Sequence, residues 1–210
     1  MTPSAAVPIL HLIAGINGAG KTSFYFDVLK TRTPDAEFVN ADLIERECWP
    51  TEIGQHSYEA GRRAAVRRDE LIAARRTFVS ETVFSHTSKL ALIGRARTAG
   101  FHVVLYHIHV STAELAAARV ATRVSEGGHD VPVEKIRSRH PRTLALMRKA
   151  VRRVDRAYVF DNSRLDRGFT HVLTFEGGRI QNVGGYVPDW VKETYAEAIA
   201  AYLAEHAGKL

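Results

Sequence analysis

The segment GINGAGKT, from Gly15 to Thr22, is the feature that most constrains the fold of this chain. It fits the pattern G-x-x-x-x-G-K-[ST], in which a glycine-rich turn surrounds phosphate oxygens with backbone N–H groups. The context agrees, because the apolar run ILHLIAGI precedes the segment and a helix-like pattern follows it. The segment therefore predicts a P-loop that binds a nucleoside triphosphate with Mg²⁺, and ATP is the expected nucleotide.

Each position of this loop has an expected role. The glycines let the backbone turn with positive φ, and the following helix adds its positive N-terminal end to the phosphate site. Lys21 is expected to reach the β- and γ-phosphates, and the Thr22 hydroxyl is expected to bind Mg²⁺. The residues expected to bind ATP through this loop are Gly15, Asn17, Gly18, Ala19, Gly20, Lys21, Thr22 and Ser23.

The period of the apolar residues alternates between strands and helices, which is typical of a parallel sheet with helices on both faces. Strands are predicted at 9–16, 37–40, 77–82, 102–110 and 157–160. Helices are predicted at 20–31, about 54–76, 87–98, 112–124 and 133–155. A β-hairpin over 170–185 and a helix over 188–208 follow. The expected fold class is α/β.

Motifs of several other P-loop classes are missing from the sequence. No Asn-Lys-x-Asp segment that would read guanine is present, and the strand HVVLYHIHV ends without a Walker B aspartate. SEGGHD resembles an ABC signature loop, but no apolar run with Asp-Glu follows it. Of the P-loop classes considered, a small phosphotransferase is the one that remains. We therefore expect one P-loop kinase-like domain over 1–210, with a mostly parallel sheet flanked by helices, a helical lid at about 119–139 and a C-terminal hairpin plus helix at 170–208.

Carboxylates at the ends of two predicted strands are candidates for the acceptor site. Asp42 follows the strand FVN, and strand ends at this edge line the cleft of open α/β sheets. We expect Asp42 to be the catalytic base, and the alternative is an N-cap of the helix that follows. Glu81 and Thr82 end the strand TFVSET and are expected to hydrogen-bond the acceptor. Glu81 could instead hold a Mg²⁺-bound water, and capping is again the alternative.

Arginines on both sides of the segment EGGHDVP suggest a lid. Arg119 and Arg123 lie four residues apart and share one face of a predicted helix, and Arg137 and Arg139 follow the break. Arginines that face the P-loop would stabilise the charge of the transferring phosphoryl group. The alternative is a solvated helix face. We expect at least two of these arginines to act on phosphate.

The composition limits the partners and the compartment. A net charge of +6 would allow nucleic-acid binding, but the arginines are scattered and not interleaved with aromatics, so no nucleic-acid partner is expected. The start MTPSAAVPIL predicts no signal peptide, and no window approaches ~18 uninterrupted apolar residues, so no membrane span is expected. Cys48 is the one cysteine; it fits a reducing cytosol and is expected in the core. We expect a cytoplasmic protein.

One weaker signal is a pair of histidines, His107 and His109, on one face of a predicted strand. Such a pair could bind a metal ion. No cysteine or carboxylate joins it at ligand spacing, so we expect two histidines of the core or of the sheet face.

Six segments follow one another in a specific order: AGINGAGKTSF, FVNADLI, FVSETVFS, RVATRVSEGGHDVP, KIRSRHPRTLALM and YVFDNS. In this order of P-loop, N-x-D, E-T, lid and D-N-S, the chain resembles the zeta toxins of bacterial toxin–antitoxin systems and their P-loop kinase relatives. The resemblance runs from about Pro8 to Ser163. It implies an ATP-dependent kinase that phosphorylates a hydroxyl of a nucleotide-activated sugar such as UDP-N-acetylglucosamine.

The resemblance also implies roles for single residues. Asp42 would be the base, and one of Arg119 or Arg123 would be the lid arginine. The place of a second lid arginine holds His129, so either His129 contacts the substrate or Arg137 or Arg139 supplies the charge. The acceptor site would include Asn40, Glu81 and Thr82, and the adenine side would include Asp161, Asn162 and Ser163.

Other functions stay open at this point. The chain could be a kinase of nucleic-acid ends, of an antibiotic or of another small metabolite, or a regulatory ATP-binding module without transfer. If the product is toxic, the resemblance implies a separate antitoxin chain as a partner.

Overall fold

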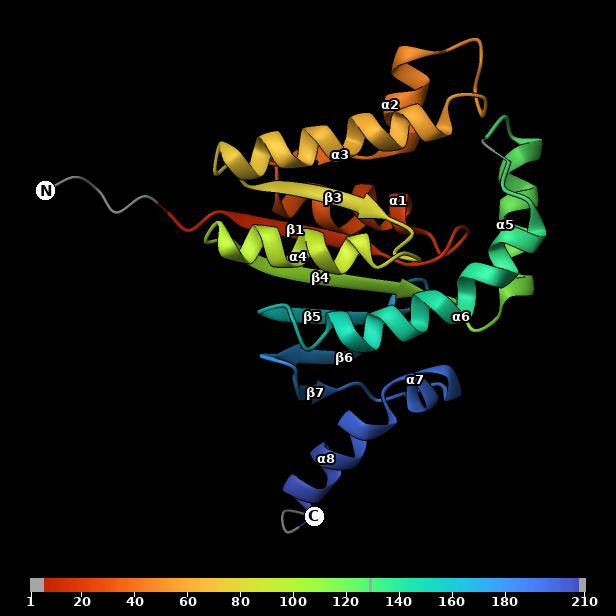
Figure 1. The fold of residues 1–210 in the computed structure, drawn as a ribbon. Helices are drawn as coiled ribbons and strands as arrows, with labels where there is room; N and C mark the ends of the chain where they lie inside the picture. The colour runs from red at the N-terminus through yellow and green to blue at the C-terminus, as the bar shows by residue number, and fades with distance from the viewer. Residues whose placement is uncertain (1–5, 129, 208–210) are drawn as a thin grey trace, which may run out of the picture.

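The computed structural model describes residues 6–128 and 130–207, and these form one sheet of seven strands in the order β2-β3-β1-β4-β5-β6-β7 (Figure 1). The strands from β2 to β5 run parallel, whereas β6 and β7 add to the β5 edge as an antiparallel hairpin. The strands are β1 (Ile9–Ala14), β2 (Glu37–Val39), β3 (Phe78–Thr82), β4 (His102–His109), β5 (Arg156–Asp161), β6 (Thr170–Glu176) and β7 (Arg179–Val183).

Helices connect the parallel strands and cover both faces of the sheet. In Figure 1, α4 and α6 lie in front of the sheet, and α1 lies behind it. The helices are α1 (Lys21–Phe24), α2 (Ala41–Cys48), α3 (Ser57–Ala73), α4 (Ser88–Thr98), α5 (Ala113–Ser125), α6 (Val133–Ala150), α7 (Asp189–Thr194) and α8 (Ala196–His206). The predicted class, a mostly parallel α/β sheet with a C-terminal hairpin and helices, is confirmed.

The sheet separates two apolar cores, because the side chains of each strand alternate between its faces. On one face, Leu10 and Leu12 of β1 pack with buried residues of α3, α4 and α6. On the other face, Ile13 packs with Phe24 and with buried residues of α5. The central strand is therefore buried on both sides, as its unbroken apolar run predicts. This rigid sheet carries the loop between β1 and α1.

Two predicted helices are interrupted. The helix expected at 20–31 has one α-helical turn and then continues as a π-helix (Tyr25–Leu29) and a 3₁₀-helix (Lys30–Arg32). The π-helix begins where Tyr25 stacks on Phe38, with ring centroids 3.6 Å apart. The helix expected at 188–208 divides at Tyr195, which is buried and turns out of helical geometry at φ −115°.

Cys48 corrects another expectation. It lies at the exposed end of α2 and not in the core, and the guanidinium of Arg63 donates to its sulfur at 3.2 Å. Within residues 6–128 and 130–207, every helix is too short or too polar to pass through a lipid bilayer.

The two histidines of β4 are buried under α6 and α7. His107 Nδ1 lies 2.8 Å from the hydroxyl of Tyr195, and His109 Nε2 lies 3.1 Å from Nε2 of His140 on α6. Burial, together with the charge of His140, lowers the pKa of His107 to about 3. Burial also lowers the pKa values of His109 and His140. The neutral rings thus belong to the packed interior.

This burial predicts acid sensitivity. Because the pKa of His107 is lower in the folded state than in the unfolded state, its neutral ring stabilises the fold above pH ~6.5, and this contribution is lost as the pH falls toward 3. At pH 5 the loss from His107 alone is about 2 kcal/mol. We expect urea unfolding of His107→Gln to depend less on pH between 7 and 5 than unfolding of the wild type. Equal pH slopes would contradict the assignment.

Candidate active site

The P-loop lies between the end of β1 and the start of α1, as the sequence predicts. Gly18 and Gly20 have φ values of 78° and 91°, a region that L side chains rarely adopt. Any side chain there would also collide with neighbours, because the carbonyl of Ala116 on α5 covers Gly18 and the amide of Asn162 covers Gly20. The loop is therefore held against α5 and against the segment that follows β5.

Lys21 is buried directly beneath this loop. Its Nζ donates to the carbonyl of Ile16 at 2.9 Å and lies 3.8 Å from Oε1 of Glu81. Burial lowers the pKa of Lys21, and the carboxylates of Glu81 and Asp42 oppose that shift. Burial likewise raises the pKa of Glu81, and Lys21 opposes it. Each group thus favours the charged form of the other in a site with little solvent.

Glu81 joins three elements at the end of β3. Its Oε2 accepts hydrogen bonds from Thr22 Oγ1 at 2.8 Å and from Asn40 Nδ2 at 2.7 Å. The oxygen of the same amide, Asn40 Oδ1, accepts hydrogen bonds from the backbone N–H groups of Asp42 at 2.7 Å and Leu43 at 3.2 Å. Asn40 is therefore the N-cap of α2. The capping alternative for Asp42 is wrong, because Asp42 lies in the first turn of the helix.

A pocket of about 330 Å³ opens beside the P-loop. Thr22 and Asp42 both line it, so the expected base and the expected Mg²⁺ ligand face one space. Arg46 also lines it, and the sequence reasoning missed this residue. Its spacing of four from Asp42 places both on one face of α2 and was a usable signal. The remaining lining residues are Asn40, Leu43, Arg123, Glu126 and Gly128.

The arginines of the expected lid occupy different positions. Arg123 lines the pocket, and Arg139 donates to Asn17 Oδ1 of the P-loop at 2.9 Å. Both are close enough to Lys21 to lower its pKa. Arg137, in contrast, is exposed and pairs with Glu114 and Glu134. Two arginines, Arg123 and, from α6, Arg139, therefore lie near the P-loop, and their action on phosphate stays a prediction.

Arg119 lies four residues before Arg123 on α5. Burial lowers the pKa of its guanidinium, and the carboxylate of Asp161 opposes that shift. Its Nε is buried without a hydrogen-bond partner among the residues the structure describes. The other expected lid residue, His129, lies outside the described residues.

The residues expected on the adenine side have two kinds of contact. Asn162 Nδ2 donates to the carbonyl of Ala19 at 2.9 Å and so holds the P-loop. Asp161 is buried, and its Oδ1 accepts from Trp190 Nε1 at 2.9 Å and from Ser163 Oγ at 2.5 Å. These contacts favour a structural role for Asp161. Its direct contact with ATP stays a prediction.

Two further expectations find less support in the geometry. Thr82 is not among the residues lining the pocket; its carbonyl accepts the N–H of Gly15 at 3.4 Å. Ser23 is exposed on α1. The contact of Thr82 with the acceptor and the contact of Ser23 with ATP stay predictions.

The donor set fits Mg²⁺ bound together with phosphates. Thr22 and Glu81 supply hydroxyl and carboxylate oxygens 2.8 Å apart, and Mg²⁺ prefers oxygen ligands. Among the described residues, no group of three or more His, Cys, Asp or Glu side chains could hold a metal ion by itself. In kinase-type sites the ion takes one or two protein oxygens, and phosphates and waters complete its shell.

Comparison with known proteins places this geometry in context. A family model described as an AAA domain matches residues 10–163. An uncharacterized protein of Haemophilus influenzae is 27% identical over 128 residues, which cover 60% of this chain and 88% of that protein.

Solved structures share the fold. A chain of the AvrRxo1-ORF1:AvrRxo1-ORF2 complex with sulphate ions matches with a TM-score of 0.69 at 18% identity, over 92% of this chain and 64% of that chain. The chain thus spans less than two thirds of that relative, which was also solved with ATP. A chain of the PezAT chromosomal toxin–antitoxin system of Streptococcus pneumoniae matches with a TM-score of 0.62 at 16% identity, over 96% of this chain and 88% of that one. The predicted resemblance to zeta toxins is confirmed at the level of the fold.

Proposed function

We propose that this chain, which belongs to the AAA-domain family over residues 10–163, is an ATP-dependent kinase that transfers the γ-phosphoryl group to a hydroxyl of a small acceptor. The observation that carries the proposal is the shared pocket of Thr22 and Asp42 beside the P-loop. A carboxylate across from the phosphate site is what an acceptor hydroxyl requires. A purely regulatory ATP-binding module would not need it.

Each residue of the candidate site has a separate role in the proposed transfer. The P-loop N–H groups and Lys21 hold the phosphates, while Thr22 and, through water, Glu81 hold Mg²⁺, which neutralises phosphate charge when bound. Asp42 orients the acceptor hydroxyl and accepts its proton as the oxygen bonds to the γ-phosphorus. The bond from that phosphorus to the oxygen bridging to the β-phosphate breaks, and ADP leaves. Arg123 and Arg139 stabilise the charge that spreads over the transferring group.

We further propose that the acceptor is a nucleotide-activated sugar such as UDP-N-acetylglucosamine. The resemblance to zeta toxins supports this class. Arg46 and Arg123 line the pocket and offer two cations to a diphosphate. Glu126 at the same pocket would accept hydrogen bonds from sugar hydroxyls.

Purified protein with Mg-ATP and a panel of UDP-sugars tests both levels of this proposal. We expect acceptor-dependent ADP release, and mass spectrometry should show one added phosphate on the sugar. If oligonucleotide ends or an antibiotic were phosphorylated in parallel assays, the assignment as a kinase would stand and the assignment of the acceptor would change. ATP binding without ADP release from any arm, including a metabolite extract, would contradict the kinase itself.

We also propose an antitoxin as a protein partner. The support is that two proteins of like fold come from the AvrRxo1-ORF1:AvrRxo1-ORF2 complex and the PezAT toxin–antitoxin system. The basic charge of this chain favours an acidic partner.

A further inference from the structure

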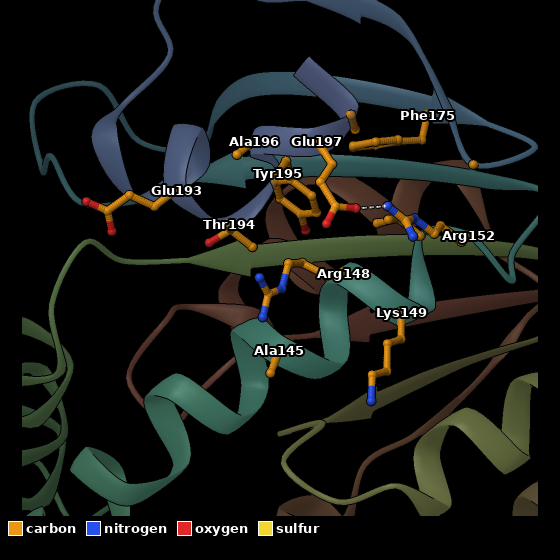
Figure 2. A pocket seen from close by; sticks show the side chains of 13 residues that line it. Ala145, Arg148, Lys149, Arg152, Phe175, Glu193, Thr194, Tyr195, Ala196 and Glu197 are labelled. Carbon is orange, nitrogen blue, oxygen red and sulfur yellow. Dashed lines mark hydrogen bonds and ion pairs between the residues drawn. The ribbon is translucent and has the colours of Figure 1, made fainter. Parts of the chain in front are cut away.

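A second pocket, of about 490 Å³, lies between α6 and the junction of α7 with α8 (Figure 2). It shares no lining residue with the pocket beside the P-loop. The proposed reaction therefore does not account for it. The lining residues that matter here are Ala145, Arg148 and Arg152 of α6, Phe175 of β6, and Thr194 and Tyr195 at the helix junction.

The lining of this pocket is mixed, with an apolar part and a charged part. Phe175 and Tyr195 are buried, and their ring centroids lie 5.3 Å apart. The polar atoms of the helix junction are already bonded inside the protein. Thr194 Oγ1 donates to the carbonyl of Trp190 at 2.6 Å, and the Tyr195 hydroxyl lies 2.8 Å from His107 Nδ1. The helix junction thus offers surface for an apolar body, and the polar contacts of the pocket come from its charged side chains.

Two cations that line this pocket lack a partner among the described residues. Arg152 pairs with Glu197 at 2.6 Å, but neither Arg148 nor Lys149 forms a hydrogen bond or ion pair with any residue in the described part of the chain. Figure 2 shows Arg148 lying between α6 and Thr194. The pocket therefore combines apolar surface with two cations whose charge is not compensated within the described residues.

We propose that this pocket binds a small ligand that joins an aromatic or aliphatic body to one anionic group, such as a carboxylate, sulfonate or phosphate. The apolar part of the lining removes the body from water, as in most small-molecule sites. The guanidinium of Arg148 donates charge-assisted hydrogen bonds to the anion, and its planar fork suits such groups. This site goes beyond the proposed kinase reaction and does not depend on it.

Two fluorescent dyes probe this combination of features. Anilinonaphthalene sulfonate has an aromatic body and one anionic group, and phenylnaphthylamine has the same body without the sulfonate. We expect both to bind the full chain, the sulfonate more tightly. In Arg148→Gln the affinity for the sulfonate should fall about fivefold or more, while the affinity for the neutral dye stays the same.

Two further variants locate the site. Lys135→Gln removes the same charge from an exposed residue of α6 that does not line the pocket, and should leave both affinities unchanged. Ala145→Trp should fill the pocket and weaken both dyes, and thermal unfolding of each variant reports that it folds. Equal effects of Arg148→Gln and Lys135→Gln on the sulfonate would overturn the proposal, as would unchanged binding of both dyes to a folded Ala145→Trp variant.

Discussion

Replacing Asp42 by asparagine should lower kcat for phosphoryl transfer by about 10²- to 10⁴-fold, the range for loss of a positioned general base. The amide keeps the size of the side chain but cannot accept the acceptor's proton. The fold should persist, because Asn40 and not Asp42 caps α2. Binding of Mg-ATP should stay within about twofold, because Asp42 lies across the pocket from the P-loop and is not part of it.

The measurement pairs acceptor-dependent ADP release with calorimetric titration of ATP. Glu47→Gln is the matched control, because it removes an exposed carboxylate from the same helix outside the pocket. It should behave as the wild type. An Asp42→Asn enzyme with wild-type kcat would remove Asp42 from the role of base and with it the main support for a hydroxyl acceptor.

Lys21→Ala should have the second large effect, a fall in kcat of about 10²- to 10³-fold together with weaker Mg-ATP binding. Loss of Nζ removes a cation from the expected position of the β- and γ-phosphates. It also leaves the buried carboxylate of Glu81 without its cation, 3.8 Å away in the wild type, which would raise the pKa of Glu81 further. That change favours the protonated form of Glu81, which supports Mg²⁺ less well.

The pH dependence of kcat separates these two causes. If protonation of Glu81 contributes, the residual activity of Lys21→Ala should rise with pH more steeply than that of the wild type. Lys30→Ala is the control, since Lys30 is exposed on the same segment, over the ring of Phe26. Retention of wild-type kcat by Lys21→Ala would contradict a phosphate-binding role for the loop.

Local signals were sufficient to predict the fold and the centre of the site. The glycine spacing fixes the loop before Lys21, and strand ends bring Asn40 and Glu81 to the same edge of the sheet, which the 2.7 Å hydrogen bond between them shows. The alternation of strands and helices likewise fixed a parallel sheet. These features depend on residues close in sequence or on a general rule of α/β sheets.

Other features depend on contacts that no local pattern encodes. The break at Tyr195 follows from a bond to His107, 88 residues away. The choice between Arg137 and Arg139 depends on which side of α6 faces the P-loop, and Glu114 and Glu134 settle it by pairing with Arg137. The pocket at Arg148 requires α6, α7 and β6 to be placed together, so no prediction of it was possible. The single-domain extent of the chain and the cytoplasmic location stay predictions.

The contacts that hold α7 against the sheet limit where the chain can be truncated or fused to another protein. Trp190 is bonded to Asp161 and Tyr195 to His107, so the C-terminal helices are fastened to the two strands that carry one flank of the nucleotide loop. Removing these helices would expose to water the carboxylate of Asp161 and two imidazoles of β4, which are now buried. Water would then also reach the strands that support the candidate active site. A reporter or affinity tag therefore belongs after α8, and a shortened version that stops before Pro188 should be less stable than the 210-residue chain.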